Sequence, residues 1–95
     1  MITSKQRAYL RSQANNLEVI FQVGKNGISE EMCRQIANAL EARELIKARV
    51  LSNSGYDAKD AANEIADFID AEVVSVVGTK FVLYKESKNN KRIEL

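Results

Sequence analysis

Several residue types are missing or scarce in this chain of 95 residues, and each absence narrows its chemistry. No histidine is present, so the commonest general base of enzymes is absent. The single cysteine, Cys33, permits no intramolecular disulfide, and without histidine a Cys/His zinc site cannot be assembled. We therefore expect no metal, no cofactor and no enzymatic activity. A lone cysteine also fits a reducing compartment, so we expect a cytoplasmic protein.

Long apolar runs are missing as well. No segment approaches the roughly 20 apolar residues that cross a bilayer. The opening stretch, MITSKQRAYLRSQ, lacks the continuous apolar segment of a signal peptide. We therefore expect no membrane association. The composition, 45% apolar and 28% charged, is typical of a globular protein. We expect a monomer with one domain over residues 1–87 and a flexible basic tail over residues 88–95.

Hydrophobic patterning predicts an α+β fold in the order α-β-α-β-α-β-β, with a mixed four-stranded sheet. Thr3 or Ser4, Ser29 and Asp57 are the expected helix N-caps. The apolar side of the third helix is expected to bury Ala61, Ile65, Phe68 and Ile69. The expected strands are Val19–Val23, Leu45–Leu51, Glu72–Val77 and Phe81–Lys85. The last two form a hairpin, and Gly78 suits the first turn position of a type II′ turn.

Charge is distributed unevenly behind a net value of only +1. Residues 1–56 carry eight basic and five acidic side chains, a net of +3. Residues 57–72 carry one basic and six acidic side chains, a net of −5, and residues 73–95 carry five and two, a net of +3. Such asymmetry favours a basic face for a polyanion, although scattered solvated charge would give the same totals.

The segment GKNG, Gly24–Gly27, follows an apolar strand and precedes a capped helix. Residues without Cβ allow positive φ and let another backbone come close. The free N–H groups and partial positive charge of the next helix would face a phosphate there, and Lys25 and Asn26 add a cation and a donor. Against this, Glu30 and Glu31 already occupy the positive end of the helix. The residues alone leave a phosphate clamp and a plain turn open.

Other basic residues form two groups. Lys5, Arg7 and Arg11 recur along the first helix, and Lys47 and Arg49 alternate on one face of the second strand. Each group is also what a solvated face would carry. If the groups converge with Lys25 on one surface, RNA binding is favoured; if they do not, a small protein-interaction adaptor without nucleic-acid contact is the better hypothesis. For a phosphate clamp, the acidic third helix should lie away from the loop.

Four stretches together resemble one family. These are TSKQRAYLRSQA, VGKNGIS, ALEARELIKARVL and VVGTKFVLYKES, whose order and spacing over about residues 2–87 resemble the CRM domain, and most closely its small bacterial YhbY-like members. One departure is Val19, where many relatives have proline. The resemblance implies a sheet topology similar to the C-terminal domain of translation initiation factor 3.

The same resemblance implies a function. Members bind RNA through a loop compared with the GxxG loop of KH domains, and they associate with precursors of the large ribosomal subunit. Carried over, the RNA-contacting loop is Gly24, Lys25, Asn26 and Gly27, and basic positions of similar sequences match Lys5, Arg7, Lys47 and Arg49. The partner is then ribosomal RNA, and the role is ribosome assembly without catalysis. Contacts of this kind hold the RNA backbone and read no bases.

Overall fold

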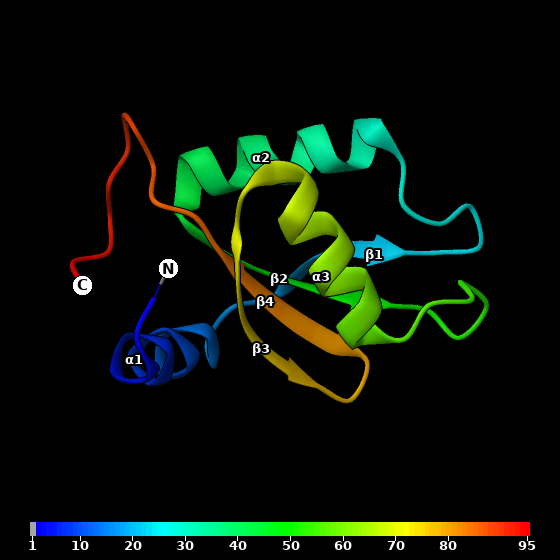
Figure 1. The fold of residues 1–95 in the computed structure, drawn as a ribbon, viewed down its shortest axis with the longest axis horizontal. Helices are drawn as coiled ribbons and strands as arrows, with labels where there is room; N and C mark the ends of the chain where they lie inside the picture. Colours follow the sequence, from blue (N-terminus) through cyan, green and yellow to red (C-terminus); the bar gives the residue numbers. More distant parts are fainter. Residues whose placement is uncertain (1) are drawn as a thin grey trace.

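The computed structural model describes residues 2–95, so Met1, the first residue of the expected domain, lies outside the described part. The expected order of elements is confirmed (Figure 1). The helices are α1 (Ser4–Ala14), α2 (Glu30–Arg43) and α3 (Ala58–Ile69). The strands are β1 (Val19–Val23), β2 (Leu45–Val50), β3 (Glu72–Val77) and β4 (Lys80–Tyr84). None of the helices in residues 2–95 is long and apolar enough to cross a membrane.

The four strands form one mixed sheet in the order β1-β2-β4-β3. β1 and β2 are parallel and are joined by α2, while β4 is antiparallel to both β2 and β3. The hairpin turn has φ 60° at Gly78 and no positive φ at Thr79, as a type II′ turn requires. The N–H of Val50 donates to the carbonyl of Thr79 at 2.8 Å. The end of β2 is therefore tied to the hairpin turn.

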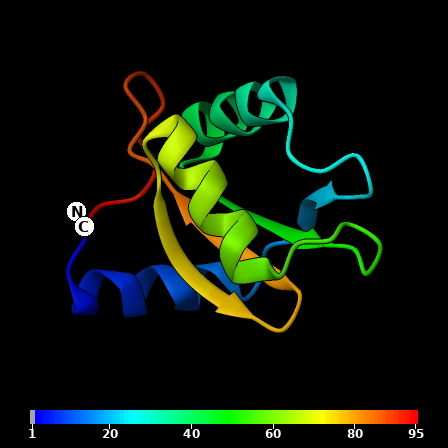
Figure 2. The same ribbon diagram turned by 45° about the vertical axis from the view of Figure 1, so that its right-hand side comes forward.

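The helices cover opposite faces of the sheet: α2 and α3 lie side by side on one face, and α1 lies on the other (Figure 2). Strand alternation produces this arrangement because successive side chains point to opposite faces. On β2, Ile46, Ala48 and Val50 join the larger core under α2 and α3. Leu45 instead packs with Leu10 of α1 in a smaller core.

Each helix begins with the expected cap. Thr3 Oγ1 accepts the N–H of Gln6 at 3.1 Å, and Gln6 Oε1 accepts the N–H of Thr3 at 2.9 Å, which completes a capping box. Ser29 and Asp57 accept from backbone N–H groups three residues later in the same way. These side chains satisfy amide donors that the first helical turn leaves free, which fixes where α2 and α3 begin.

The burial of α3 differs from the expectation at one position. Phe68 is 63% exposed, whereas Ala61, Ile65 and Ile69 are buried as expected. The missing apolar contacts come from alanines: Ala58, Ala62 and Ala66 are also buried. Small side chains let α3 lie close to the sheet, so its buried face is centred on them and Phe68 is left at the margin.

The segment after β4 also differs from the expected mobile tail. Backbone N–H groups of Ser87, Arg92 and Ile93 donate to the carboxylate of Glu44, and Ile93 packs against the smaller core. The sequence pattern hid this because both partners are ordinary polar residues. The expected domain boundary at residue 87 stays a prediction, but residues 87–93 make defined contacts with the end of α2.

Candidate nucleic-acid interface

The GKNG segment forms a tight turn at the end of β1. The N–H of Gly27 donates to the carbonyl of Gly24 at 2.9 Å, and Lys25 and Asn26 are exposed at the tip. Neither tip residue has positive φ, whereas Gly27 has φ 72°. The loop projects from the molecule beside the segment that follows β2 (Figure 1). Its cation is therefore open to a partner.

The two glycines have different reasons to be glycine. Gly27 needs its positive φ, which costs an L-residue about 1 kcal/mol or more. Gly24 has no positive φ, and a Cβ there would meet Leu51 Cδ1 at 3.7 Å, an ordinary contact. The turn thus explains Gly27 but not Gly24. Close approach of another molecule would explain the second glycine.

The N-terminus of α2 offers fewer donors than expected. The turn uses the N–H of Gly27 internally, so this group is not free to donate to a partner. Within residues 2–95, the N–H groups of Ile28, Ser29 and Glu30 have no hydrogen-bond partner. Glu30 and Glu31 occupy the first turn of the helix, where they already complement its positive end. The helix end is therefore a weaker phosphate site than its free donors suggest.

We expected the acidic third helix to lie away from the loop, and this expectation is wrong for one carboxylate, that of Glu64. A Cβ on Gly27 would lie 3.5 Å from Cε2 of Tyr56, and the hydroxyl of Tyr56 donates to the carboxylate of Glu64 at 3.3 Å. The reason is topological, since α3 begins at the same end of the sheet as α2 and packs beside it.

Burial, together with Glu64 and Glu30, raises the pKa of the Cys33 thiol, which therefore stays protonated at neutral pH.

The opposite face of the sheet is basic. Arg49 on β2 is paired with Lys80 on β4, and on its other side with Gln22 on β1. Directly paired residues of antiparallel strands point to the same face, so two cations stand side by side. Such a pair is destabilising by itself. The Nε of Arg49 is buried and has no hydrogen-bond partner within residues 2–95.

Two further cations join this surface from α1 and β2. Arg11, Lys47 and Lys80 line a hollow of about 240 Å³ together with Asn15, Ser75 and apolar side chains. Within residues 2–95, no carboxylate lines it. We call Arg11, Lys47, Arg49 and Lys80 the basic face. The GKNG loop begins two residues after Gln22, the β1 partner of Arg49, so the loop and the basic face border each other.

Not every expected basic residue belongs here. Lys5 lines a different hollow with Tyr9 and Glu94, near the other end of α1. Arg7 Nε donates to the carbonyl of Val73 at 3.3 Å, which gives it a structural contact with β3. Conversely, sequence analysis missed Lys80, because it took the strand to begin at Phe81. Extending the hairpin pairing by one residue would have placed Lys80 opposite Arg49.

Comparison with known proteins gives a consistent result. Residues 2–85 match the CRS1/YhbY (CRM) domain. A Bacillus subtilis protein named "Probable RNA-binding protein YqeI" is 52% identical over 95 residues, covering 100% of this chain and 99% of that protein. A Haemophilus influenzae protein named "RNA-binding protein" is 31% identical over 90 residues, covering 95% and 91%.

One solved structure extends the comparison to the fold. The solution structure of the hypothetical protein SAV1595 from Staphylococcus aureus is similar with a TM-score of 0.82 and 50% sequence identity. The similarity covers 100% of this chain and 99% of that one. The three helices and four-stranded mixed sheet are therefore shared over the full length.

Proposed function

Because this chain belongs to the CRS1/YhbY (CRM) domain family, we propose that it binds RNA, with the GKNG loop and the basic face holding the phosphate backbone. The observation that carries the proposal is the direct pairing of Arg49 with Lys80 beside a hollow that no carboxylate lines. A fold gains nothing from this repulsion, whereas a phosphate between the two cations removes it.

The chemistry of the surface suits a backbone rather than a base sequence. Lys25 and the basic face offer point charges and guanidinium donors, and phosphate contacts of this kind fix the register of a strand without reading bases. The carboxylates of Glu30, Glu31 and Glu64 belong to α2 and α3, which cover the opposite face of the sheet. The RNA is therefore expected to reach Gly24 from the side of the basic face, where the absence of a Cβ on Gly24 leaves space.

For the identity of the RNA, we propose ribosomal RNA in precursors of the large ribosomal subunit, bound by a monomer without catalysis. This finer proposal is supported by the family resemblance alone. Crosslinking in cells, followed by sequencing of the bound RNA, tests it directly. Recovery of transfer or messenger RNA in place of ribosomal RNA would overturn the finer proposal and leave RNA binding intact.

The binding test uses substitutions matched in charge. Lys80→Ala and Lys25→Ala each remove one phosphate contact, so each is expected to lower the slope of log K against log salt by roughly 0.7 on single-stranded RNA. Gly27→Asp should cost more than Lys25→Ala because it adds a carboxylate at the loop. The control is Lys59→Ala, an exposed cation on the acidic α3. If all variants fold and bind like the control, the adaptor hypothesis replaces RNA binding.

A further inference from the structure

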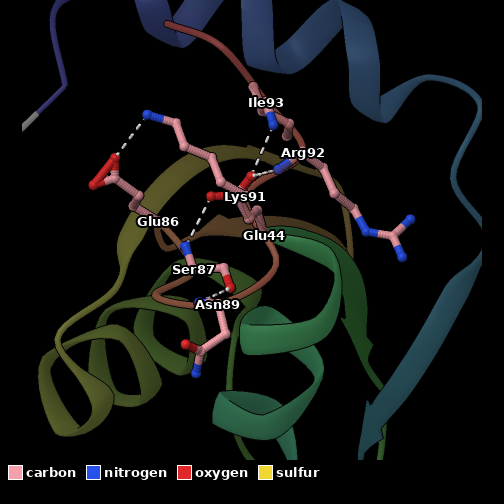
Figure 3. Close-up of polar contacts among 7 residues, drawn as sticks. All are labelled: Glu44, Glu86, Ser87, Asn89, Lys91, Arg92 and Ile93. Atoms are coloured by element: carbon pink, nitrogen blue, oxygen red, sulfur yellow. Dashed lines mark hydrogen bonds and ion pairs between the residues drawn. The ribbon is translucent and has the colours of Figure 1, made fainter.

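Two carboxylates at the end of α2 hold the C-terminal segment. Glu44 is fully buried, and its carboxylate accepts the N–H of Ser87 and of Ile93 at 2.8 Å each, and that of Arg92 (Figure 3). Glu41 accepts the hydroxyl of Ser87 at 2.7 Å and the N–H of Asn89 at 3.0 Å. We call Glu41 and Glu44 the carboxylate latch. It fixes the segment at both of its ends.

The latch remains ionised at neutral pH. Burial alone would raise the pKa of Glu44, but the three backbone N–H donors outweigh it and leave the pKa lowered. The hydroxyl of Ser87 and the N–H groups of Lys88 and Asn89 lower the pKa of Glu41 to about 2. A carboxylate that accepts several N–H bonds is favoured in its charged form, so the segment and the charges hold each other in place.

The latch determines the position of one arginine. The N–H of Arg92 donates to Glu44, and the next residue, Ile93, packs against the smaller core together with Leu17. The backbone of Arg92 is therefore held by both contacts. Its side chain extends away from the latch (Figure 3). It lines a hollow of about 500 Å³ with Gln13, Leu17 and Arg43. Two arginines from distant parts of the chain thus share one hollow, and none of the described residues that line it is a carboxylate.

This hollow connects to the basic face. A smaller hollow of about 160 Å³ shares Leu17, Arg43 and Leu45 with it, and also contains Lys47, which lines the hollow of the basic face. On β2 the three hollows are lined by residues of its amino-terminal half, Lys47 in the hollow of the basic face, Leu45 to Lys47 in the middle one and Leu45 in the third. Cations recur along the whole path. Glu18, in the middle hollow, is the single carboxylate among the residues that line the three.

We propose that Arg43 and Arg92 form a second phosphate-binding pair, which extends the basic face so that one RNA strand runs from the GKNG loop along β2 to the C-terminal segment. The ligand is a single strand longer than the four nucleotides or so that a KH-type loop holds. Guanidinium groups bind phosphate through two parallel N–H bonds, and the latch holds the backbone of one of the two arginines in place. This inference rests on the proposed RNA-binding function and adds to it a length requirement.

The test compares RNA strands of two lengths, about 4 and about 16 nucleotides, at several salt concentrations. The variant R43A/R92A is expected to bind the long strand about tenfold more weakly near 0.15 M salt, with the slope lower by roughly 1.4. Binding of the short strand should not change. The control K88A/K91A removes the same charge from exposed cations that do not line this hollow, and it should bind both strands like the parent.

The outcomes separate this inference from the proposed function. If R43A/R92A binds the long strand as tightly as K88A/K91A while Lys80→Ala weakens both strands, the arginine pair is solvated charge and RNA binding stands. If Lys80→Ala also has no effect, the proposed function itself fails. Glu18→Gln supplies a test of opposite sign: it should strengthen binding of the long strand by about twofold to fivefold, the size of one screened charge interaction. Unchanged or weaker binding by Glu18→Gln would overturn the path through the middle hollow.

Discussion

Replacing Glu44 by glutamine measures how strongly the latch holds the C-terminal segment. The side chain keeps its shape, but an amide NH₂ replaces one carboxylate oxygen, so either the N–H of Ser87 or those of Arg92 and Ile93 face a donor. The remaining bonds also lose their charge assistance. Three bonds to a charged group are worth about 5–9 kcal/mol in sum, which is an upper limit on the loss.

The actual loss of stability is smaller because the variant can release the C-terminal segment. Residues 87–93 can leave the surface, and each then regains about 1 kcal/mol or more of conformational free energy. We therefore expect Glu44→Gln to lower the free energy of unfolding by about 2–3 kcal/mol. At this chain length that is a fall in Tm of roughly 10–20 °C. Urea denaturation followed by circular dichroism gives the free energy.

A second carboxylate in the same segment provides the control. Glu86 forms an exposed ion pair with Lys91 at 3.2 Å, and exposed pairs contribute about 0–1 kcal/mol. Glu86→Gln should therefore leave the stability nearly unchanged. Amide signals of Ser87, Arg92 and Ile93 report docking independently of global stability. If Glu44→Gln is as stable as Glu86→Gln and these signals do not move, the latch does not hold the segment and the reasoning is refuted.

Two further predictions concern acidity and the loop. The pKa of Glu41 is lowered from 4.5 to about 2, so its contribution to docking is fully present above its ordinary pKa and is lost as the pH falls through about 2. The amide signals of Lys88 and Asn89 during an acid titration check this. Signals that stay fixed down to pH 2 would contradict it. Gly27→Ala should destabilise the fold by about 1 kcal/mol because the φ of Gly27 is 72°. Gly24→Ala should leave the melting temperature unchanged and weaken RNA binding. An equal fall in melting temperature for the two variants would show that both glycines serve the turn.

Local patterns predicted the elements of this fold well, because each is encoded by residues near one another. Caps at Thr3, Ser29 and Asp57 and the alternation of β2 needed no tertiary information. Phe68 was misplaced because its exposure depends on how closely an alanine-rich helix approaches the sheet. A pattern of apolar residues does not contain that distance.

The candidate site was predictable only in part, for a related reason. Gly24–Gly27, Lys47 and Arg49 stand in recognisable local contexts, but Lys80 becomes meaningful only once β4 is paired with β2. Glu44 gave no signal at all. It ends α2 in the left-handed conformation, φ 66°, where glycine is usual, and its carboxylate meets residues more than forty positions later in the chain. Contacts of that range depend on the whole topology.

The paired cations of β2 and β4 also bear on how such a protein can change. Arg49 and Lys80 are directly paired on adjacent strands, so replacing either with an acid would relieve a repulsion and form a cross-strand ion pair. Selection or design for thermal stability alone would therefore favour that replacement. A chain that retains both cations stays below its attainable stability, which is the trade-off between stability and activity that the proposed phosphate contact would explain.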